Sequence, residues 1–115
     1  MEDTLRRLIK ISGVLGAGII ERDGLPVSIE GDFGVNGDLL AATCADILAN
    51  VEGGFGEKMG QGFTELMEFD TESSKWFLCG INQDAFLVIK SEAKVNLGLL
   101  RIEAKNIKAA LSTIL

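Results

Sequence analysis

Apolar residues recur at helical spacing in three parts of the chain, and the first is close to the N-terminus. Residues 4–12 place Leu5, Leu8 and Ile9 on one face of a helix, with basic side chains opposite. Asp3 or Thr4 is suited to cap this helix, and Gly13 to end it. The pattern predicts a short amphipathic helix.

The second helical pattern, residues 37–52, is apolar around most of its circumference. Thr43, Asp46 and Asn50 share one narrow face with Leu39, and the rest is apolar over an arc of roughly 220° at 100° per residue. The bulky part of that arc consists of Leu40, Cys44, Ile47, Leu48 and Val51, and the small part of Ala41, Ala42, Ala45 and Ala49. The bulky side suits a sheet. The alanine side suits a second helix, either the chain's own terminal helix or the same helix of another subunit.

The end of this central helix is not fixed by local rules. Gly53-Gly54 favours an end there, since a glycine costs about 1 kcal/mol in a helix interior. Phe55 and Met59 nevertheless keep the helical spacing beyond the two glycines.

The third helical pattern follows Asn96, a suitable N-cap. Its apolar stripe consists of Leu97, Leu100, Ala104, Ile107, Leu111 and Ile114. The opposite face holds Arg101, Lys105, Lys108 and Ser112. We expect the stripe to face a sheet and the basic side to face outward.

Five segments have the composition of β-strands. Residues 14–21 and 26–29 flank the turn Arg22-Asp23-Gly24-Leu25, whose Asp-Gly pair is typical of a hairpin. Pro26 places the second strand at or near a sheet edge. Residues 63–70, 76–81 and 85–89 are separated by short polar turns and predict an antiparallel meander.

The predicted element order is α-β-β-α-β-β-β-α. Five antiparallel strands with flanking helices define an α+β fold, which we expect to be two-layered and to form one domain over residues 1–115.

Composition excludes several classes of function. The net charge of −6 disfavours nucleic acid and anionic membrane surfaces, which attract basic patches. There is no signal-peptide pattern, and no apolar run is long enough for membrane insertion. Cys44 and Cys79 lie in different elements and are expected to be buried free thiols in a reducing, cytoplasmic compartment.

Residues for catalysis are scarce. The chain has no histidine, the commonest general base and transition-metal ligand, and no tyrosine. The glycine-rich run 53–60 lacks the spacing of a phosphate-binding loop, and Lys58 does not follow a correctly placed glycine. We therefore expect neither an enzyme nor a bound metal or cofactor.

Several segments resemble the Roadblock/dynein light-chain domain family along nearly the whole chain. They are residues 16–27 (Gly-Ala-Gly-Ile-Ile-Glu-Arg-Asp-Gly-Leu-Pro-Val), 39–48, 86–89 (Phe-Leu-Val-Ile) and 96–101 (Asn-Leu-Gly-Leu-Leu-Arg). The compact chain suggests a prokaryotic-type, single-domain member.

The resemblance implies a homodimer with a continuous sheet. The central helices would pair antiparallel, and the third strands would join edge to edge. The implied interface consists of Leu40, Ala41, Cys44, Ala45, Leu48 and Ala49 from the helix, and of Phe63, Leu66 and Phe69 from the strand. Family members act as non-enzymatic scaffolds, as regulators of small Ras-like GTPases or as light chains of motor complexes. This chain is therefore expected to bind itself and a small Ras-like GTPase, or to assemble a motor-associated complex.

Two alternatives remain open from the residues. A small-molecule sensor would need a pocket between sheet and helices, lined by Met67, Trp76, Phe77 and Phe86. Arg22, Lys58 and Arg101 would either meet an acidic partner surface or be solvated surface charges.

Overall fold

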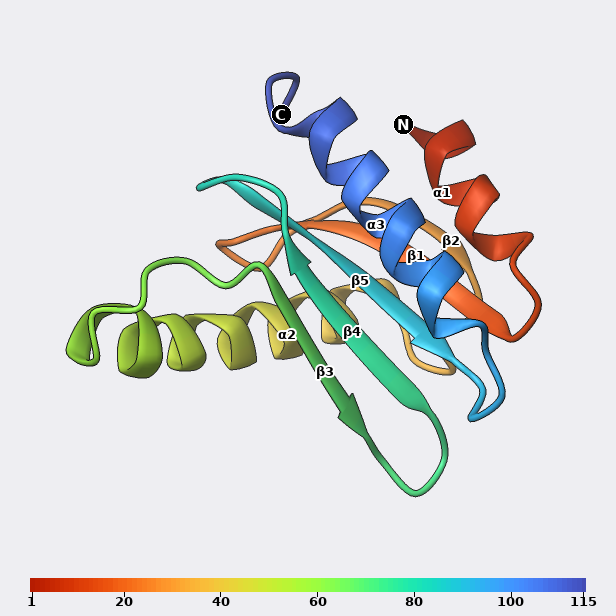
Figure 1. Cartoon of the computed structure of the whole chain (residues 1–115), viewed down its shortest axis with the longest axis horizontal. Coiled ribbons are helices and arrows are strands. Elements are labelled where there is room, and N and C mark those ends of the chain that lie inside the picture. Colours follow the sequence, from red (N-terminus) through yellow and green to blue (C-terminus); the bar gives the residue numbers. More distant parts are fainter.

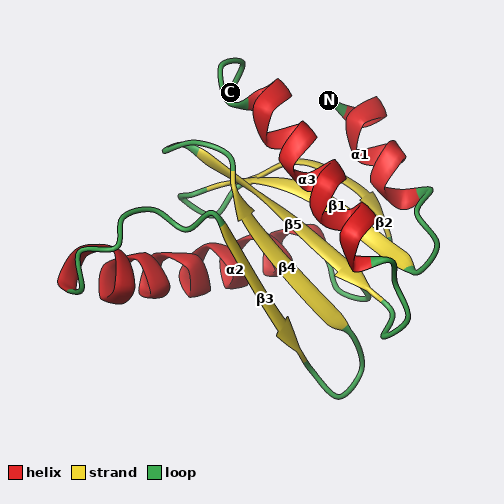
Figure 2. Cartoon of the chain, in the orientation of Figure 1, coloured by secondary structure: helices red, strands yellow, loops and turns green.

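A five-stranded antiparallel sheet in the order β2-β1-β5-β4-β3 forms the centre of the computed structural model, which describes all residues 1–115 (Figures 1 and 2). The strands are β1 (Val14–Glu21), β2 (Pro26–Gly31), β3 (Leu66–Asp70), β4 (Lys75–Gly80) and β5 (Ala85–Ser91). The helices are α1 (Glu2–Ile9), α2 (Gly37–Val51), its π-helical continuation η1 (Glu52–Lys58), and α3 (Leu97–Leu111).

The predicted element order and strand pairing are confirmed. β1 and β2 form a hairpin whose turn contains Gly24 at φ +97°, and Pro26 lies on the edge strand β2. β3, β4 and β5 form the predicted meander, while β1 pairs with β5 to join the hairpin to it. Gly16 in β1 leaves room for the Phe33 ring, which would lie 2.9 Å from an added Cβ.

Helices cover both faces of the sheet, so the chain has three layers rather than the two we expected. Figure 1 shows α1 and α3 side by side on one face and α2 on the other. Each face has its own core, because the inner strands are apolar on both sides. Leu5, Leu8, Leu100 and Ile107 belong to the α1/α3 core. The core under α2 includes Leu40, Leu48, Phe86 and Val88.

Helix α2 does not end at Gly53-Gly54. It begins at Asn36, whose side chain accepts a hydrogen bond from the Leu39 amide at 2.8 Å, and it continues as η1 to Lys58. Glu52, at the junction, pairs with Arg22 and accepts a hydrogen bond from the Thr64 amide at 2.8 Å. These tertiary contacts hold the helical backbone past glycines whose own preference is to end it.

The remaining helix and strand limits differ at the ends. Strand β3 begins at Leu66 rather than at residue 63, because residues 63–65 cross the end of β4, where the Gly80 amide bonds the Glu65 carbonyl. Helix α1 begins at Glu2 without a side-chain cap and ends at Ile9. Asn96 caps α3 as predicted, and its side chain accepts a hydrogen bond from the Leu99 amide at 3.0 Å.

The surroundings of the η1 glycines predict how alanine substitutions there change the stability of the chain. A Cβ at Gly54 would meet nothing within 4 Å, whereas one at Gly56 would lie 2.5 Å from the Gly62 carbonyl oxygen. Gly54→Ala should therefore raise the free energy of unfolding by about 0.5–1 kcal/mol, because alanine favours helix. Gly56→Ala should lower it. Urea unfolding of both variants measures this, and equal effects would contradict the tight Gly56–Gly62 approach.

Candidate protein-interaction face

Helix α2 covers only part of its face of the sheet. Five strands span about 19 Å between the outermost axes, whereas a helix with side chains is about 10 Å across. Helix α2 packs over β1 and β2, on one half of the sheet. On the β4 and β3 side, Figure 1 shows α2 crossing behind one end of the two strands and no helix of this chain behind the half next to the β3–β4 turn.

An apolar groove of about 310 Å³ lies between α2 and this uncovered half. Its lining comprises Val35, Leu39, Leu40, Thr43, Cys44, Ile47, Phe69, Thr71 and Trp76. The floor is aromatic: the rings of Phe69 and Trp76 stack with centroids 6.5 Å apart, and both residues are only half-buried. Leu39 is 55% exposed. Contiguous exposed apolar surfaces are candidate interaction sites.

The groove adjoins an unpaired strand edge. β3 is the last strand of the sheet and pairs with β4 alone, so its outer backbone groups have no strand beside them. Native proteins cover or blunt such edges, because a free edge is a template for pairing with another chain. The groove and the edge therefore form one surface, which we call the α2–β3 face.

The implied dimer residues do not share one surface of the single chain. Five of the six on α2 are buried against the chain's own sheet: Leu40, Ala41, Cys44, Ala45 and Leu48. Ala49 is exposed, Phe63 lies 70% exposed in the loop before β3, and Leu66 is 39% exposed on the opposite face of β3. Phe69 lines the groove, as do the largely buried Leu40 and Cys44. Their role in an interface remains a prediction.

The rotation of α2 explains this distribution. Ala45 packs into the core under α2, and the β1–β2 turn lies close by, since a Cβ at Gly24 would be 3.6 Å from the Ala42 Cα. Ala41 and Ala45 of the alanine side are thus buried against the sheet, whereas Ala42 and Ala49 are exposed, and α3 lies on the other face. The side chains that α2 presents to the groove include Leu39, Thr43 and Ile47. The signal in the sequence was Leu39, an apolar residue on the polar face.

Arg22 fixes the far end of α2 to the sheet, and is not a solvated surface charge. Its guanidinium pairs with Glu52, its Nε donates to the Asn82 carbonyl at 2.8 Å, and it lies 5.3 Å from the Phe63 ring centroid. The side chains of Arg22 and Glu52 are 17% and 14% exposed. This cluster sets the path of the chain from η1 into β3.

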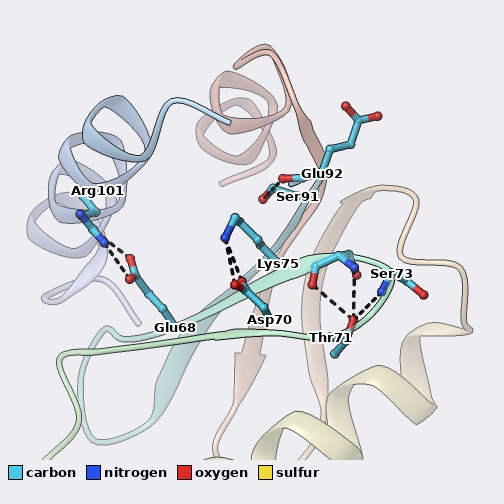
Figure 3. A network of polar contacts seen from close by, with 9 residues as sticks. Glu68, Asp70, Thr71, Ser73, Lys75, Ser91, Glu92 and Arg101 are labelled. Atoms are coloured by element: carbon cyan, nitrogen blue, oxygen red, sulfur yellow. Dashed lines mark hydrogen bonds and ion pairs between the residues drawn. The ribbon is translucent and has the colours of Figure 1, made fainter. Parts of the chain in front are cut away.

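Arg101 is also paired. Figure 3 shows its guanidinium facing Glu68 of β3, with two hydrogen bonds of 2.8 and 2.7 Å. These hydrogen bonds lower the pKa of the Glu68 carboxyl. Lys75 likewise pairs with Asp70 at 3.0 Å. Both contacts lie on the α3 side of the sheet and tie the edge strand to α3 and β4. Lys58 makes no ion pair.

No single cavity brings together the four side chains expected for a small-molecule sensor. Phe77 belongs to the α1/α3 core, whereas Phe86 belongs to the core under α2, and both are buried. A separate hollow of about 490 Å³ lies beside Glu21, Asp23 and Asp84. It is open and acidic, and Asp23 raises the pKa of the Glu21 carboxyl. Ligand pockets are lined predominantly by hydrophobic side chains, whereas five of the eight residues lining this hollow are polar or charged.

The two cysteines are structural. Cys44 and Cys79 are buried in different cores, and burial raises the pKa of the Cys44 thiol to about 11. A thiol in that state is protonated at neutral pH and is a poor nucleophile. None of the helices is both long and apolar enough to cross a membrane.

The chain belongs to the Roadblock/LC7 domain family, which it matches over residues 1–91. The protein MJ0310 of Methanocaldococcus jannaschii is 29% identical over 105 residues, covering 91% of this chain and 90% of that protein. Among solved structures, Myxococcus xanthus MglB superposes with a TM-score of 0.89 at 18% identity, over 98% of this chain and 92% of that one. A Roadblock/LC7 domain from Streptomyces avermitilis superposes with a TM-score of 0.88 at 14% identity, over 98% of this chain and 95% of that one. These structures show the fold.

The Glu68–Arg101 contact predicts a pH dependence. A carboxyl whose pKa is lowered in the folded state stabilises the fold above its unfolded-state pKa, about 4.3, and that stabilisation is lost as the pH falls through the lower folded-state pKa. Glu68→Gln should therefore be less stable than the unmodified chain at pH 7, and the difference should vanish near pH 2–3. Urea unfolding over this pH range measures it. A difference that is independent of pH would contradict the pairing.

Proposed function

We propose that the chain forms a homodimer through the α2–β3 face, and that the dimer is a non-enzymatic, cytoplasmic scaffold or regulator that binds a small Ras-like GTPase. The observation that carries the proposal is an apolar groove directly beside an unpaired strand edge. Two free thiols buried in the cores suit a reducing compartment.

A single two-fold axis would both pair the β3 edge and cover the groove of the α2–β3 face. It would set the two β3 edges side by side and lay each α2 beside its copy, over the half-sheet that neither chain covers alone. Such an interface is self-complementary, as two-fold dimers require. The aromatic floor at Phe69 and Trp76 would then be covered by Leu39 and Ile47 of both copies.

The projecting end of α2 would also be covered in this arrangement. Figure 2 shows α2 and η1 extending past the edge of the sheet. Phe55 and Met59 of η1 are each 59% exposed, and at the other end of α2 Val35 is 50% exposed. Antiparallel helices would place Phe55 and Met59 of one copy beside Val35 of the other.

The GTPase partner rests on family membership and on the charge of α2. Regulation of small GTPases is among the roles that the family resemblance implies. Helix α2 carries Asp38 and Asp46 on its exposed side and no basic residue. A pair of α2 helices would present an acidic surface, so the contacting surface of the GTPase should be basic.

The dimer predicts a molar mass of twice 12.3 kDa in solution, stable over a range of concentrations. Ile47→Glu should lower the mass to that of one chain while the far-UV circular dichroism stays unchanged. Burying an isoleucine contributes about 1.5–3 kcal/mol, and each 1.4 kcal/mol is tenfold in the dissociation constant. Light scattering or sedimentation equilibrium measures the mass.

Two control variants separate dimer loss from unfolding. Ile102→Glu introduces the same charge at a residue that is 58% exposed on α3, and it should remain dimeric. Ala45→Glu should unfold the chain, because Ala45 is 7% exposed against the sheet. A dimer that survives Ile47→Glu, or that is lost equally in Ile102→Glu, would overturn the proposed interface.

The proposed binding of a GTPase is tested by the retention of GTPases on the immobilised chain. Ras-like GTPases of the source organism, loaded with GDP or with a non-hydrolysable GTP analogue, should be retained in one nucleotide state and released by salt. Asp46→Lys should reduce retention at least fivefold without changing the dimer mass, because Asp46 is exposed on α2. Failure to retain either form, with an intact dimer, would refute the GTPase partner and leave the dimer standing.

A further inference from the structure

The layer built by α1 and α3 is basic in an otherwise acidic protein. Residues 1–12 and 92–115, which form this layer, contain seven Lys and Arg and four Asp and Glu. Residues 13–91 contain four Lys and Arg and thirteen Asp and Glu. The layer therefore carries a net charge of +3 and the remainder −9. Figure 1 shows that it lies on the opposite side of the sheet from α2.

Most cations of this layer have no partner within the chain. Arg6 and Arg101 form ion pairs, but five others form neither an ion pair nor a side-chain hydrogen bond. They are Arg7, Lys10, Lys94, Lys105 and Lys108, and all but the half-buried Lys108 are exposed. Since thirteen acidic residues lie elsewhere in the chain, this segregation leaves a surface complementary to external negative charge.

Exposed apolar side chains lie among these cations. Leu99 is 41% exposed and Ile102, one turn further along α3, is 58% exposed, although the buried face of α3 is already complete without them. Leu99 and Lys94 line the same shallow hollow, where the end of α1 meets the start of α3 through Ile11 and Val95. Apolar contact and positive charge are thus available within one surface.

We propose that this surface, the α3 patch of Lys94, Leu99, Ile102 and Lys105, docks an acidic amphipathic helix of a partner protein. Apolar side chains one turn apart on such a helix would contact Leu99 and Ile102, and its flanking carboxylates would meet Lys94 and Lys105. The patch lies beyond residue 91, outside the segment matched to the family. It also lies on the other face from the α2–β3 groove, so the inference does not depend on the proposed dimer or GTPase.

An anionic membrane is a weaker fit to the same chemistry. A membrane surface extends over the whole protein and would repel the net −9 of the remaining residues, whereas a peptide meets only the patch. Two exposed apolar side chains on the patch are also few for a membrane-binding face.

The experiment selects binders from a displayed library of random 16-residue peptides on the immobilised full chain. Selected peptides are then measured by fluorescence anisotropy at 50 and 300 mM NaCl. They are tested against the unmodified chain, a patch variant (Lys94→Glu with Ile102→Ser) and a control variant, Lys58→Glu. Lys58 is exposed and unpaired but lies on η1, on the other layer, so its substitution tests net charge alone.

The α3 patch predicts that selected peptides are net negative, with apolar residues at i, i+3 or i+4. The patch variant should bind these peptides at least tenfold more weakly than the unmodified chain, and Lys58→Glu less than twofold more weakly. Raising NaCl to 300 mM should weaken binding to the unmodified chain at least fivefold, because the charged contacts are exposed and screened by salt. Selection of neutral or basic peptides, or equal losses in the two variants, would overturn the proposal. So would an absence of binders, or co-sedimentation of the chain with phosphatidylserine vesicles in place of peptide binding. Circular dichroism establishes that the variants are folded.

Discussion

The structure depends on a mismatch in width between the sheet and the single helix on one of its faces. Two helices cover the α1/α3 side, but on the other side α2 alone must cover five strands. It packs over β1, β2 and part of β5 and β4, and leaves Phe69 of β3 and Trp76 of β4 half-exposed. The uncovered half accounts for the apolar groove. Because the hydrophobic effect favours burying such a surface, a second copy of the chain that covered it would be stabilising.

Two charge contacts determine where the free edge of the sheet lies. Arg22 and Glu52 join the hairpin to the end of α2, and the Thr64 amide bonds the same carboxylate just before β3 begins. On the other face, Arg101 holds Glu68 in the middle of β3. The edge strand is thus positioned from both sides by groups far apart in the sequence. An interface that requires two copies of β3 to meet in register needs this rigidity.

The sequence predicts the order of the elements because periodicity, turn residues and helix caps act locally, as at Asn36, Asn96 and the Asp23-Gly24 turn. It could not predict the rotation of α2, because an apolar arc of roughly 220° permits several orientations and the sheet decides among them. Ala45, which we expected in the dimer interface, is buried in the core under α2 within the single chain. The continuation of α2 into η1 was left open and the pairing of Arg22 was missed, since both depend on contacts across 12 to 60 residues of sequence.

Residue-level amide exchange in β3 tests the central claim most directly. In the proposed dimer, the Leu66–Asp70 amides that do not bond β4 pair with the partner's β3. They should exchange as slowly as those of β4 at high protein concentration, and should become faster on dilution, while exchange in β5 stays constant. If these outer amides exchange rapidly at every concentration, the edge is open in solution, and the α2–β3 face is not the surface through which the chain pairs.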